Sequence, residues 1–420
     1  MSIKILSVVG ARPNFMKIAA VCEAIREYNA SSKPLLIDHV LVHTGQHYDT
    51  NMSDMFFNDL ELPTPNLFLG VGSGSHSIQT AKIMEGFEKV LLAEKPDMVI
   101  VVGDVNSTVA CALVTKKTCW TTQTERDFIP KLVHVEAGLR SFDRTMPEEV
   151  NRIVTDALSD VLFTTEESAN ENLKREGVSE DKIHFVGNVM IDTLLRYRTK
   201  AKESTILKDL QLYDNDGPKP YAILTLHRPA NVDDHGTLSK MLDAFLQISR
   251  DLPLVFPAHP RTLKQIQEAD LGDYFVDHFL DRPEPWDSRV RIRLLPPLGY
   301  LDFLELMSLA QVVLTDSGGI QEETTILGVP CITLRDNTER PVTLTHGTNV
   351  LVGSDCKKII EEFGRVVQGQ RQTPPAPQLW DGNAARRIIR TLVEEETRSA
   401  GLLLPSGADP IPSIDSQHPD

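Results

Sequence analysis

The sequence predicts an α/β protein made of two Rossmann-like domains with parallel sheets. Short apolar runs rich in Val and Ile alternate along the chain with segments of helical period. Such runs are typical of strands buried on both faces of a parallel sheet, and the alternation indicates βαβ units. A polar stretch after Asp192 interrupts the alternation, which resumes at Ala222. Because 420 residues exceed the size of a typical single core, two domains are expected.

Several of the apolar runs lead directly into glycine or charged residues. In the N-terminal half the expected strands are Ile3–Val9, Val40–His43, Met98–Val102, Leu132–Val135, Val161–Thr164 and His184–Val186. In the C-terminal half they are Ala222–Leu226, Leu254–Pro257, Val290–Leu295, Val312–Thr315 and Cys331–Leu334. Expected helices between them include Met16–Tyr28, Ser77–Glu94, Gly236–Arg250 and Tyr300–Ala310. Ligands of such sheets bind at the carboxyl ends of strands, so the two halves are expected to face a central cleft.

The composition limits the classes of partner. A formal charge of -16 argues against broad binding to nucleic acid or to an anionic membrane. The five cysteines are scattered without C-x-x-C spacing, so neither a zinc site nor a disulfide framework is expected. The N-terminus leads straight into a strand, and no window approaches the roughly 20 apolar residues of a membrane span. We therefore expect a cytoplasmic protein that binds no metal.

Two glycine turns are candidate phosphate sites. The block Gly10–Lys17 follows the first strand and opens a helix, where Arg12 and Lys17 are placed to contact an anion. A plain strand–helix turn with solvated basic residues is the alternative. The block Asp316–Thr325 follows the strand Val312–Thr315 in the same way.

The second block offers more binding groups than the first. Ser317, Gly318 and Gly319 present backbone N–H groups and a hydroxyl at a helix N-terminus, which suits a diphosphate. Glu323 lies further along that helix, where a carboxylate can accept the two hydroxyls of a ribose. A structural turn is again the alternative, but a buried acidic pair without a ligand is costly.

Basic residues follow three other strands of the C-terminal half. His227 stands where Ala222–Leu226 ends and is placed to donate to a phosphate or to a leaving oxygen. A lone histidine at a strand end is more often structural, but Arg228 and the cluster His259–Arg261 favour bound phosphate. Arg340, after Cys331–Leu334, would close the diphosphate site unless it forms a surface ion pair.

Three carboxylates lie at or near strand ends of the N-terminal half: Asp104, Glu136 and Glu148. Removal of a proton from an unactivated carbon needs a base, an acid and neighbours that shift their pKa values. Helix capping is the alternative for Asp104 and for the neighbouring Glu149. That alternative is weaker for Glu136, which stands between Val135 and Ala137 in an apolar setting.

Taken together, these blocks resemble the non-hydrolysing UDP-N-acetylglucosamine 2-epimerases. The resemblance runs from about Ile3 to about Asp355. The blocks that occur in the family's order are Gly10–Lys17, Thr44–Asp49, Gly103–Thr108, His134–Ser141, Met146–Arg152, His227–Asn231 and Asp316–Glu323. Each block is weak alone, but the ordered set is highly specific.

The resemblance implies the GT-B architecture. It implies an N-terminal domain of residues 1–192 with the acid–base carboxylates and a UDP-binding domain of residues 193–380. A helix near 381–398 would cross back onto the first domain. Residues 401–420, rich in Pro, Ser and Asp, are expected to be a disordered tail. The polar segment Thr118–Asp127 departs from the family's usual short connection.

The resemblance also implies roles for individual residues. The implied catalytic residues are Asp104, Glu136, Glu148 and His227. The implied substrate and UDP contacts are Arg12, Lys17, Phe303, His227, Ser317, Gly318, Gly319, Glu323 and Arg340. Gln46 and His47 match a region near a second, activating UDP-sugar site in bacterial members. Leu298 stands where the family often has a Gln that contacts the uridine.

The implied reaction is elimination of UDP across C1–C2 to a 2-acetamidoglucal, followed by re-addition after C2 is protonated from the other face. It needs no metal and no nicotinamide cofactor. The implied enzyme is a homodimer that feeds surface polysaccharide synthesis. Three alternatives stay open: a 2-epimerase of UDP-2,3-diacetamido-2,3-dideoxy-glucuronate, a GT-B glycosyltransferase with an acceptor site, and a non-catalytic UDP-sugar sensor.

Overall fold

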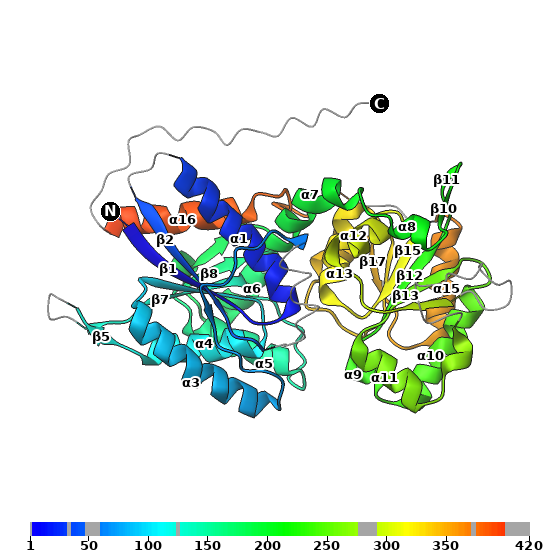
Figure 1. The fold of residues 1–420 in the computed structure, drawn as a ribbon, viewed down its shortest axis with the longest axis horizontal. Helices are drawn as coiled ribbons and strands as arrows, with labels where there is room; N and C mark the ends of the chain where they lie inside the picture. Colours follow the sequence, from blue (N-terminus) through cyan, green and yellow to red (C-terminus); the bar gives the residue numbers. More distant parts are fainter. Residues whose placement is uncertain are drawn as a thin grey trace.

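Two parallel sheets, each covered by helices, form the two halves of the molecule in Figure 1. The computed structural model describes residues 2–31, 35–46, 59–122, 127–275, 292–370 and 375–399. The elements of the first half are β1 (Ser2–Val9), α1 (Arg12–Ala30), β2 (Leu36–His43), β3 (Leu67–Phe68), α3 (His76–Glu94), β4 (Met98–Val102), α4 (Asn106–Lys117), β5 (Trp120–Thr121), β6 (Asp127–Phe128), β7 (Lys131–Ala137), α5 (Pro147–Leu158), β8 (Val161–Thr164), α6 (Glu167–Arg175), β9 (Ile183–Phe185) and α7 (Val189–Ala201).

The second half begins after α7. Its elements are α8 (Ile206–Asp209), β10 (Tyr213–Asp214), β11 (Gly217–Pro218), β12 (Ala222–Thr225), α9 (Pro229–Val232), α10 (His235–Ile248), β13 (Leu254–Pro257), α11 (Pro260–Glu268), β14 (Ile292–Leu295), α12 (Tyr300–Ser308), β15 (Val312–Thr315), α13 (Gly318–Leu327), β16 (Cys331–Thr333), α14 (Val342–Thr345), β17 (Asn349–Leu351), α15 (Cys356–Val367) and α16 (Ala384–Ser399).

Both large sheets are parallel throughout. The first has the order β3-β2-β1-β4-β7-β8-β9, and the second has the order β14-β13-β12-β15-β16-β17. Every residue of β4 and β15 is buried, as expected for central strands covered by helices on both faces. The strand order reverses beside β1 and beside β12, and the polar blocks follow strands next to these two points.

The expected strands agree closely with the observed ones, and the predicted α/β architecture is confirmed. Met98–Val102, Val161–Thr164, Leu254–Pro257 and Val312–Thr315 form strands with the same bounds. The sequence analysis missed the short strands β3 and β17 at the sheet edges. The hairpin β5–β6, where Trp120 packs against Phe128, was also not predicted.

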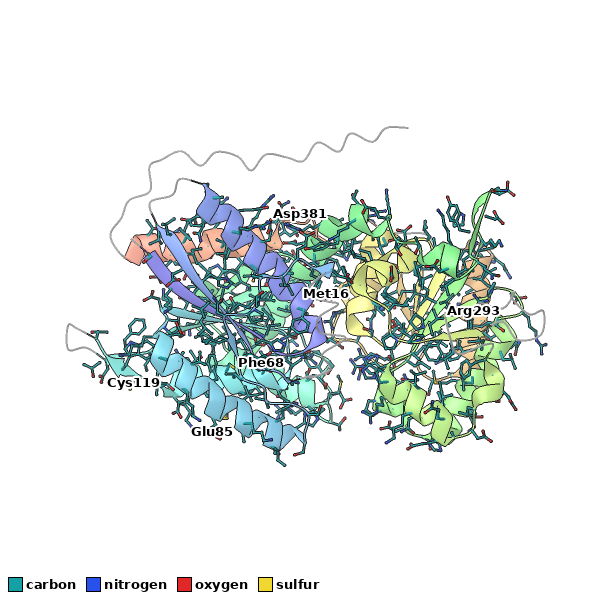
Figure 2. The ribbon with its side chains drawn as sticks, in the orientation of Figure 1. Met16, Phe68, Glu85, Cys119, Arg293 and Asp381 are labelled. Atoms are coloured by element: carbon teal, nitrogen blue, oxygen red, sulfur yellow. The ribbon has the colours of Figure 1, made fainter. Side chains whose placement is uncertain are left out.

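The last described helix packs against the first half of the molecule. In Figure 1, α16 lies beside α1, and Figure 2 shows Met16 of α1 near the junction of the two halves. Asp192 on α7 accepts the backbone N–H groups of Ala384 and Ala385 at 3.0 and 2.7 Å, which caps α16. Burial raises the pKa of Asp192 to about 6, although these two amides oppose the shift.

Two segments meet at this point, one before α7 at Gly187 and one before α16 at Leu379. They pass close together, since a Cβ on Gly187 would lie 2.0 Å from the carbonyl oxygen of Leu379. The proposed domain bounds at residues 192 and 380 stay predictions, and the expected tail 401–420 lies outside the described residues. Among the described helices, none is long and apolar enough to cross a bilayer.

Candidate active site

Polar side chains from both halves meet where the two sheets face each other. Glu136 of β7 is the centre of this group. It stands at a bulge in the pairing of β7 with β8, between Val135 and Ala137, with a backbone φ of 74°. A left-handed backbone is uncommon for a non-glycine residue, and such strain clusters at functional sites. The bulge turns this carboxylate out of the strand's alternation.

Only one of the two carboxylate oxygens of Glu136 has hydrogen-bond partners among the described residues. Its Oε1 accepts from Lys17 Nζ at 2.6 Å and from Arg340 at 3.3 Å, while its Oε2 is buried and has no hydrogen-bond partner among the described residues. Lys17 comes from α1 and Arg340 from the second half. A Cβ on Gly103, whose φ is 63°, would stand 2.8 Å from Lys17 Nζ, so glycine is needed there.

Asp104 follows Gly103 at the end of β4 and is fixed by α5. Arg152 donates to its carboxylate at 2.5 Å, and Asn151 donates to its carbonyl oxygen at 2.9 Å. Burial acts to raise the pKa of Asp104, but the charges of Arg152, Lys17 and Arg340 outweigh it and hold that pKa below the usual value. Asp104 is therefore an ionised group that shares its cations with Glu136.

Glu148 and Glu149 open α5 and face different surroundings. Glu148 is half-buried, whereas Glu149 is 1% exposed and accepts from the backbone of Ser141 and Phe142 and from Arg152. These bonds hold the pKa of Glu149 below its usual value against the opposing effect of burial. Glu149 thus fixes the loop after β7, and Glu148 is the less constrained of the two.

Arg340 pairs with three carboxylates, and one of them, Glu136, belongs to the other half. Besides Glu136, its guanidinium pairs with Glu322 at 2.7 Å and with Glu339. Burial raises the pKa of Glu322, and the negative charge of Glu136 adds to this shift, although Arg340 opposes it. The sequence predicts Arg340 at the diphosphate and takes the acidic pair of Glu322 and Glu323 as a sign of a bound ligand, but it predicts no role for Glu339.

His227 follows β12 and is oriented by Asp316, which follows β15. The two side chains meet at 2.7 Å between Nδ1 and Oδ1, and the His227 ring is 42% exposed. Arg228 donates its backbone N–H to the same carboxylate at 2.9 Å. The outer nitrogen of His227 thus remains available for a phosphate or a leaving oxygen.

The helix N-terminus after β15 forms as expected. α13 begins at Gly318, and Ser317, Gly318 and Gly319 are each half-buried. A Cβ on Gly318 would lie 2.6 Å from the guanidinium of Arg340, so a larger residue here would displace that side chain. Glu323 on the same helix accepts from Tyr300 at 3.2 Å, and burial raises its pKa to about 8.

The remaining predicted residues lie around these groups. Phe303 and Leu298 are half-buried beside the core near α12. Gln46 is buried, and its Oε1 accepts from the backbone and the hydroxyl of Ser107. The Arg12 side chain and all of His47 lie outside the described part of the structure.

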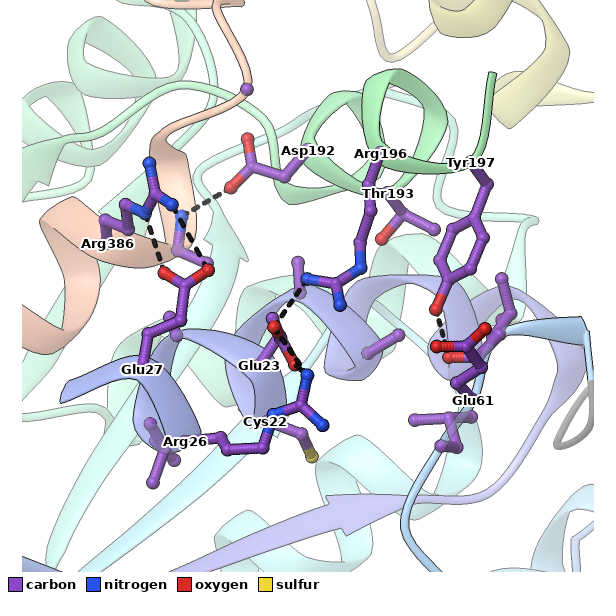
Figure 3. Close-up of a pocket in the computed structure, with 18 of the residues that line it drawn as sticks. Cys22, Glu23, Arg26, Glu27, Glu61, Asp192, Thr193, Arg196, Tyr197 and Arg386 are labelled. Atoms are coloured by element: carbon purple, nitrogen blue, oxygen red, sulfur yellow. Dashed lines mark hydrogen bonds and ion pairs between the residues drawn. The ribbon is translucent and has the colours of Figure 1, made fainter. Parts of the chain in front are cut away.

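A cavity of about 680 Å³ lies away from this group, between α1, α7 and α16 (Figure 3). Its charged lining is already paired. Glu23 bonds Arg26 and Arg196, and Arg386 bonds Glu27. None of the predicted site residues lines it. The chemistry expected from the sequence therefore belongs to the facing strand ends. Within the described ranges, no three His, Cys, Asp or Glu side chains are grouped to hold a metal ion.

Two Rossmann-like domains whose strand ends face each other with carboxylates on one side and a helix N-terminus on the other define an α/β protein of the GT-B-like class. A family model described as UDP-N-acetylglucosamine 2-epimerase matches residues 30–393. The chain belongs to the UDP-N-acetylglucosamine 2-epimerase family, and it is an enzyme of the isomerase class.

Relatives of this family align with nearly the whole chain. The UDP-N-acetylglucosamine 2-epimerase of Methanocaldococcus jannaschii is 40% identical over 394 residues, which cover 93% of this chain and 98% of that protein. The UDP-2,3-diacetamido-2,3-dideoxy-D-glucuronate 2-epimerase of Pseudomonas aeruginosa is 37% identical over 394 residues, covering 93% and 99%.

A solved structure agrees with these alignments. The M. jannaschii enzyme in complex with UDP-GlcNAc and UDP has a TM-score of 0.78 to this chain and 39% sequence identity. The alignment covers 94% of this chain and 100% of that chain.

Proposed function

We propose that this protein interconverts UDP-N-acetylglucosamine and UDP-N-acetylmannosamine by inverting C2 of the sugar. The observation that carries the proposal is the half-satisfied, buried carboxylate of Glu136, held by a lysine of one domain and an arginine of the other. A carboxylate oxygen without a partner in a closed polar site is suited to accept a proton from carbon. The substrate is proposed from the M. jannaschii relative.

The first step is an anti elimination. Glu136 takes the C2 proton, the C2–H electron pair forms the C1=C2 double bond, and the C1–O bond breaks with its electron pair leaving on UDP. The products are a 2-acetamidoglucal and UDP, both retained in the closed cleft. Lys17 and Arg340 hold the base in place during this step.

The second step re-forms the C2–H and C1–O bonds, and only the protonation of C2 takes place on the other face of the sugar. A proton is delivered to C2 from the opposite side, and the UDP oxygen re-forms the bond to C1. Arg152 keeps Asp104 ionised. An ionised carboxylate has no proton to give, so Asp104 is proposed to order the site rather than to protonate C2. Glu148 is half-buried in the first turn of α5, and it is the proposed group on the second face.

The leaving group is proposed to bind at the start of α13. The N–H groups and hydroxyl of Ser317, Gly318 and Gly319 would receive the diphosphate, which gains negative charge as C1–O breaks. His227 would donate to that charge, with Asp316 fixing its ring. Glu323 would accept the ribose hydroxyls, Phe303 would lie at the uracil, and Arg12 would contact the diphosphate or the sugar.

A second substrate has a specific observation in its favour. The P. aeruginosa relative that acts on UDP-2,3-diacetamido-2,3-dideoxy-D-glucuronate is 37% identical to this chain, close to the value for M. jannaschii. The two sugars differ at C3 and C6, where a glucuronate carboxylate would need a cation. Both substrates therefore belong in the same assay.

The assay uses solvent deuterium as the reporter. In D₂O the purified protein should convert UDP-N-acetylglucosamine into UDP-N-acetylmannosamine with deuterium at C2, observed by NMR and mass spectrometry. Retention of hydrogen at C2 with no new isomer would reject this substrate. Turnover of the diacetamido-glucuronate alone would select the second candidate, and binding without turnover of either would indicate a sensor.

Three further expectations belong to this proposal. We expect a homodimer, which light scattering of the purified protein would test, and residence in the cytoplasm, which cell fractionation would test. The product is proposed to feed surface polysaccharide synthesis. A strain without the gene would then lose the surface polymer, and added N-acetylmannosamine derivatives would restore it.

A further inference from the structure

One buried aspartate holds the residues on both sides of Glu136. Asp156 of α5 faces the end of β7 and accepts from three groups there, one on the strand and two in the loop that follows it. His134 Nδ1 lies 2.6 Å from its Oδ1, while the backbone N–H of Gly138 donates to Oδ2 at 3.0 Å and Arg140 pairs with Oδ2 at 2.7 Å. His134 stands two residues before Glu136 and Gly138 two residues after it.

These contacts fix the strained segment at both ends. Glu136 has a φ of 74°, a conformation that is unfavourable for a residue other than glycine and persists only when its surroundings enforce it. Asp156 bonds the side chain of His134 before Glu136 and the backbone N–H of Gly138 after it. The side chains of His134, Asp156 and Arg140 are at most 1% exposed, so water does not compete for these bonds.

His134 also joins this segment to the loop of Asp104. Its second ring nitrogen, Nε2, lies 2.8 Å from the carbonyl oxygen of Gly103, the residue before Asp104. A carbonyl oxygen accepts only, and so does an ionised carboxylate, so both ring nitrogens must donate. Burial acts to raise the pKa of Asp156, but the pKa lies below its usual value, and the pairing with Arg140 and the Gly138 N–H favours the anion independently of His134.

The same helix holds the other carboxylates. Arg152 of α5 bonds the side chain of Asp104, Asn151 bonds its carbonyl oxygen, and Glu148 lies in the first turn. Residues one to two turns apart on α5 thus contact both loops that carry the proposed acid–base groups.

We propose that Asp156 and a buried, doubly protonated His134 form a positioning clamp that sets Glu136 and the Asp104 loop relative to each other. Neither residue is placed against the substrate. The clamp acts by holding Glu136 in its left-handed backbone and Gly103 at a fixed distance from β7. This inference rests on the proposed function for its kinetic test but not for its structural test.

The kinetic test compares two aspartates that both bind β7. In Asp156→Asn the clamp loses its charge while the shape is kept, and a shift of the base by about 1 Å should lower kcat about 100-fold. KM should stay within about threefold, because most of the proposed UDP contacts lie in the other half and the clamp touches none of them. Asp160→Asn is the matched control, since Asp160 accepts from the backbone of Leu132 and from Lys116 at the other end of the strand.

The control should lose stability without losing kcat. If both variants lower kcat in proportion to their loss of thermal stability, or if Asp156→Asn keeps kcat within about threefold of wild type, the clamp does not position the base and the proposal is overturned. A rise in KM with unchanged kcat would also overturn it, because it would place Asp156 in binding.

The structural test uses the wild-type protein and so survives a variant that fails to fold. Histidine-selective ¹⁵N NMR at neutral pH, with His134→Gln to assign the signal, should show both ring nitrogens of His134 protonated. A single protonated nitrogen would overturn the clamp. If wild type does not epimerise UDP-N-acetylglucosamine, the proposed function fails, and this NMR result still decides the state of His134.

Discussion

Glu136 and Asp316 are both buried carboxylates at the cleft-facing ends of central strands, but they differ in how completely their oxygens are hydrogen-bonded. Asp316 is 0% exposed and is surrounded by donors, namely the His227 ring, two backbone N–H groups and Asn231. Glu136 is 2% exposed and has one oxygen held by two cations and the other without a partner.

The difference separates a carboxylate that holds the structure from one that is available for chemistry. Every oxygen of Asp316 is satisfied, so burial costs little and the group stabilises the fold. The unpartnered oxygen of Glu136 and its strained backbone are unfavourable for stability, and a fold tolerates such features where function needs them. Burial is therefore common to both acids, and what distinguishes Glu136 from Asp316 is the one oxygen that has no hydrogen-bond partner in the described part of the chain.

The strongest test of this comparison is Glu136→Gln. The amide keeps the size of the side chain but cannot take a proton from carbon, so kcat and solvent exchange at C2 should fall by about 10³-fold. The UDP dissociation constant, measured by calorimetry, should change by less than about threefold. A large loss of UDP affinity with exchange retained would move Glu136 from catalysis to binding.

Asp316→Asn tests the other half of the comparison through stability. The substitution removes the charge of a buried carboxylate that bonds the half-exposed His227 and two backbone N–H groups, so the free energy of unfolding should fall by about 3 kcal/mol, measured by denaturant titration. Burial opposes the shift, but His227 and the backbone amides lower the Asp316 pKa from 3.8 to about 2. A lowered carboxyl pKa stabilises the fold above the unfolded pKa, and this stabilisation is lost as pH falls through the folded pKa.

The pH dependence sharpens that result. Between about pH 4 and about pH 2 the wild type should lose about 2 kcal/mol that Asp316→Asn does not lose, so the two stability curves should approach each other in acid. Parallel curves over this range would show that Asp316 is not the stabilising acid described here.

The smallest expected effect concerns one donor to Asp316. Asn231→Ala removes a hydrogen bond of 3.1 Å to Asp316 and another of 3.0 Å to the carbonyl of Leu334. Because the other donors to Asp316 remain, the free energy of unfolding should fall by only about 1 kcal/mol and kcat should be unchanged within about twofold. A loss as large as that of Asp316→Asn would mean that Asn231, and not His227, is the main partner.

The fold could be predicted because each central strand is marked by residues that are close together in the sequence. Central strands such as Met98–Val102 and Val312–Thr315 are continuous apolar runs that end at polar turns, and these ends also place Asp104 and Ser317 correctly at the carboxyl edge. Edge strands such as β3 and β17 are two and three residues long, too short to give a period. Their pairing depends on a neighbouring strand rather than on their own sequence.

The sequence predicted which residues belong to the candidate site, but not which of them contact one another. Lys17 meets Glu136 across 119 positions of sequence, and Arg340 meets it across 204, so no spacing rule brings them together. Glu148 and Glu149 are neighbouring residues of the same type, so the sequence cannot tell them apart. Only the fold shows that Glu149 is the one that bonds Arg152. The left-handed backbone of Glu136 also has no sequence signal, because the position is not glycine.

The return of α16 to the first half has a consequence for how the chain folds during synthesis. Ile388, Ile389 and Leu392 of this helix belong to the same core as Ile18 and Ile25 of α1. A ribosome that has completed the first sheet has therefore not yet made the helix that covers it, and the whole second half must be translated first. Until then the first half exposes an apolar face, which makes it a natural client for a chaperone and a poor candidate for expression as an isolated fragment.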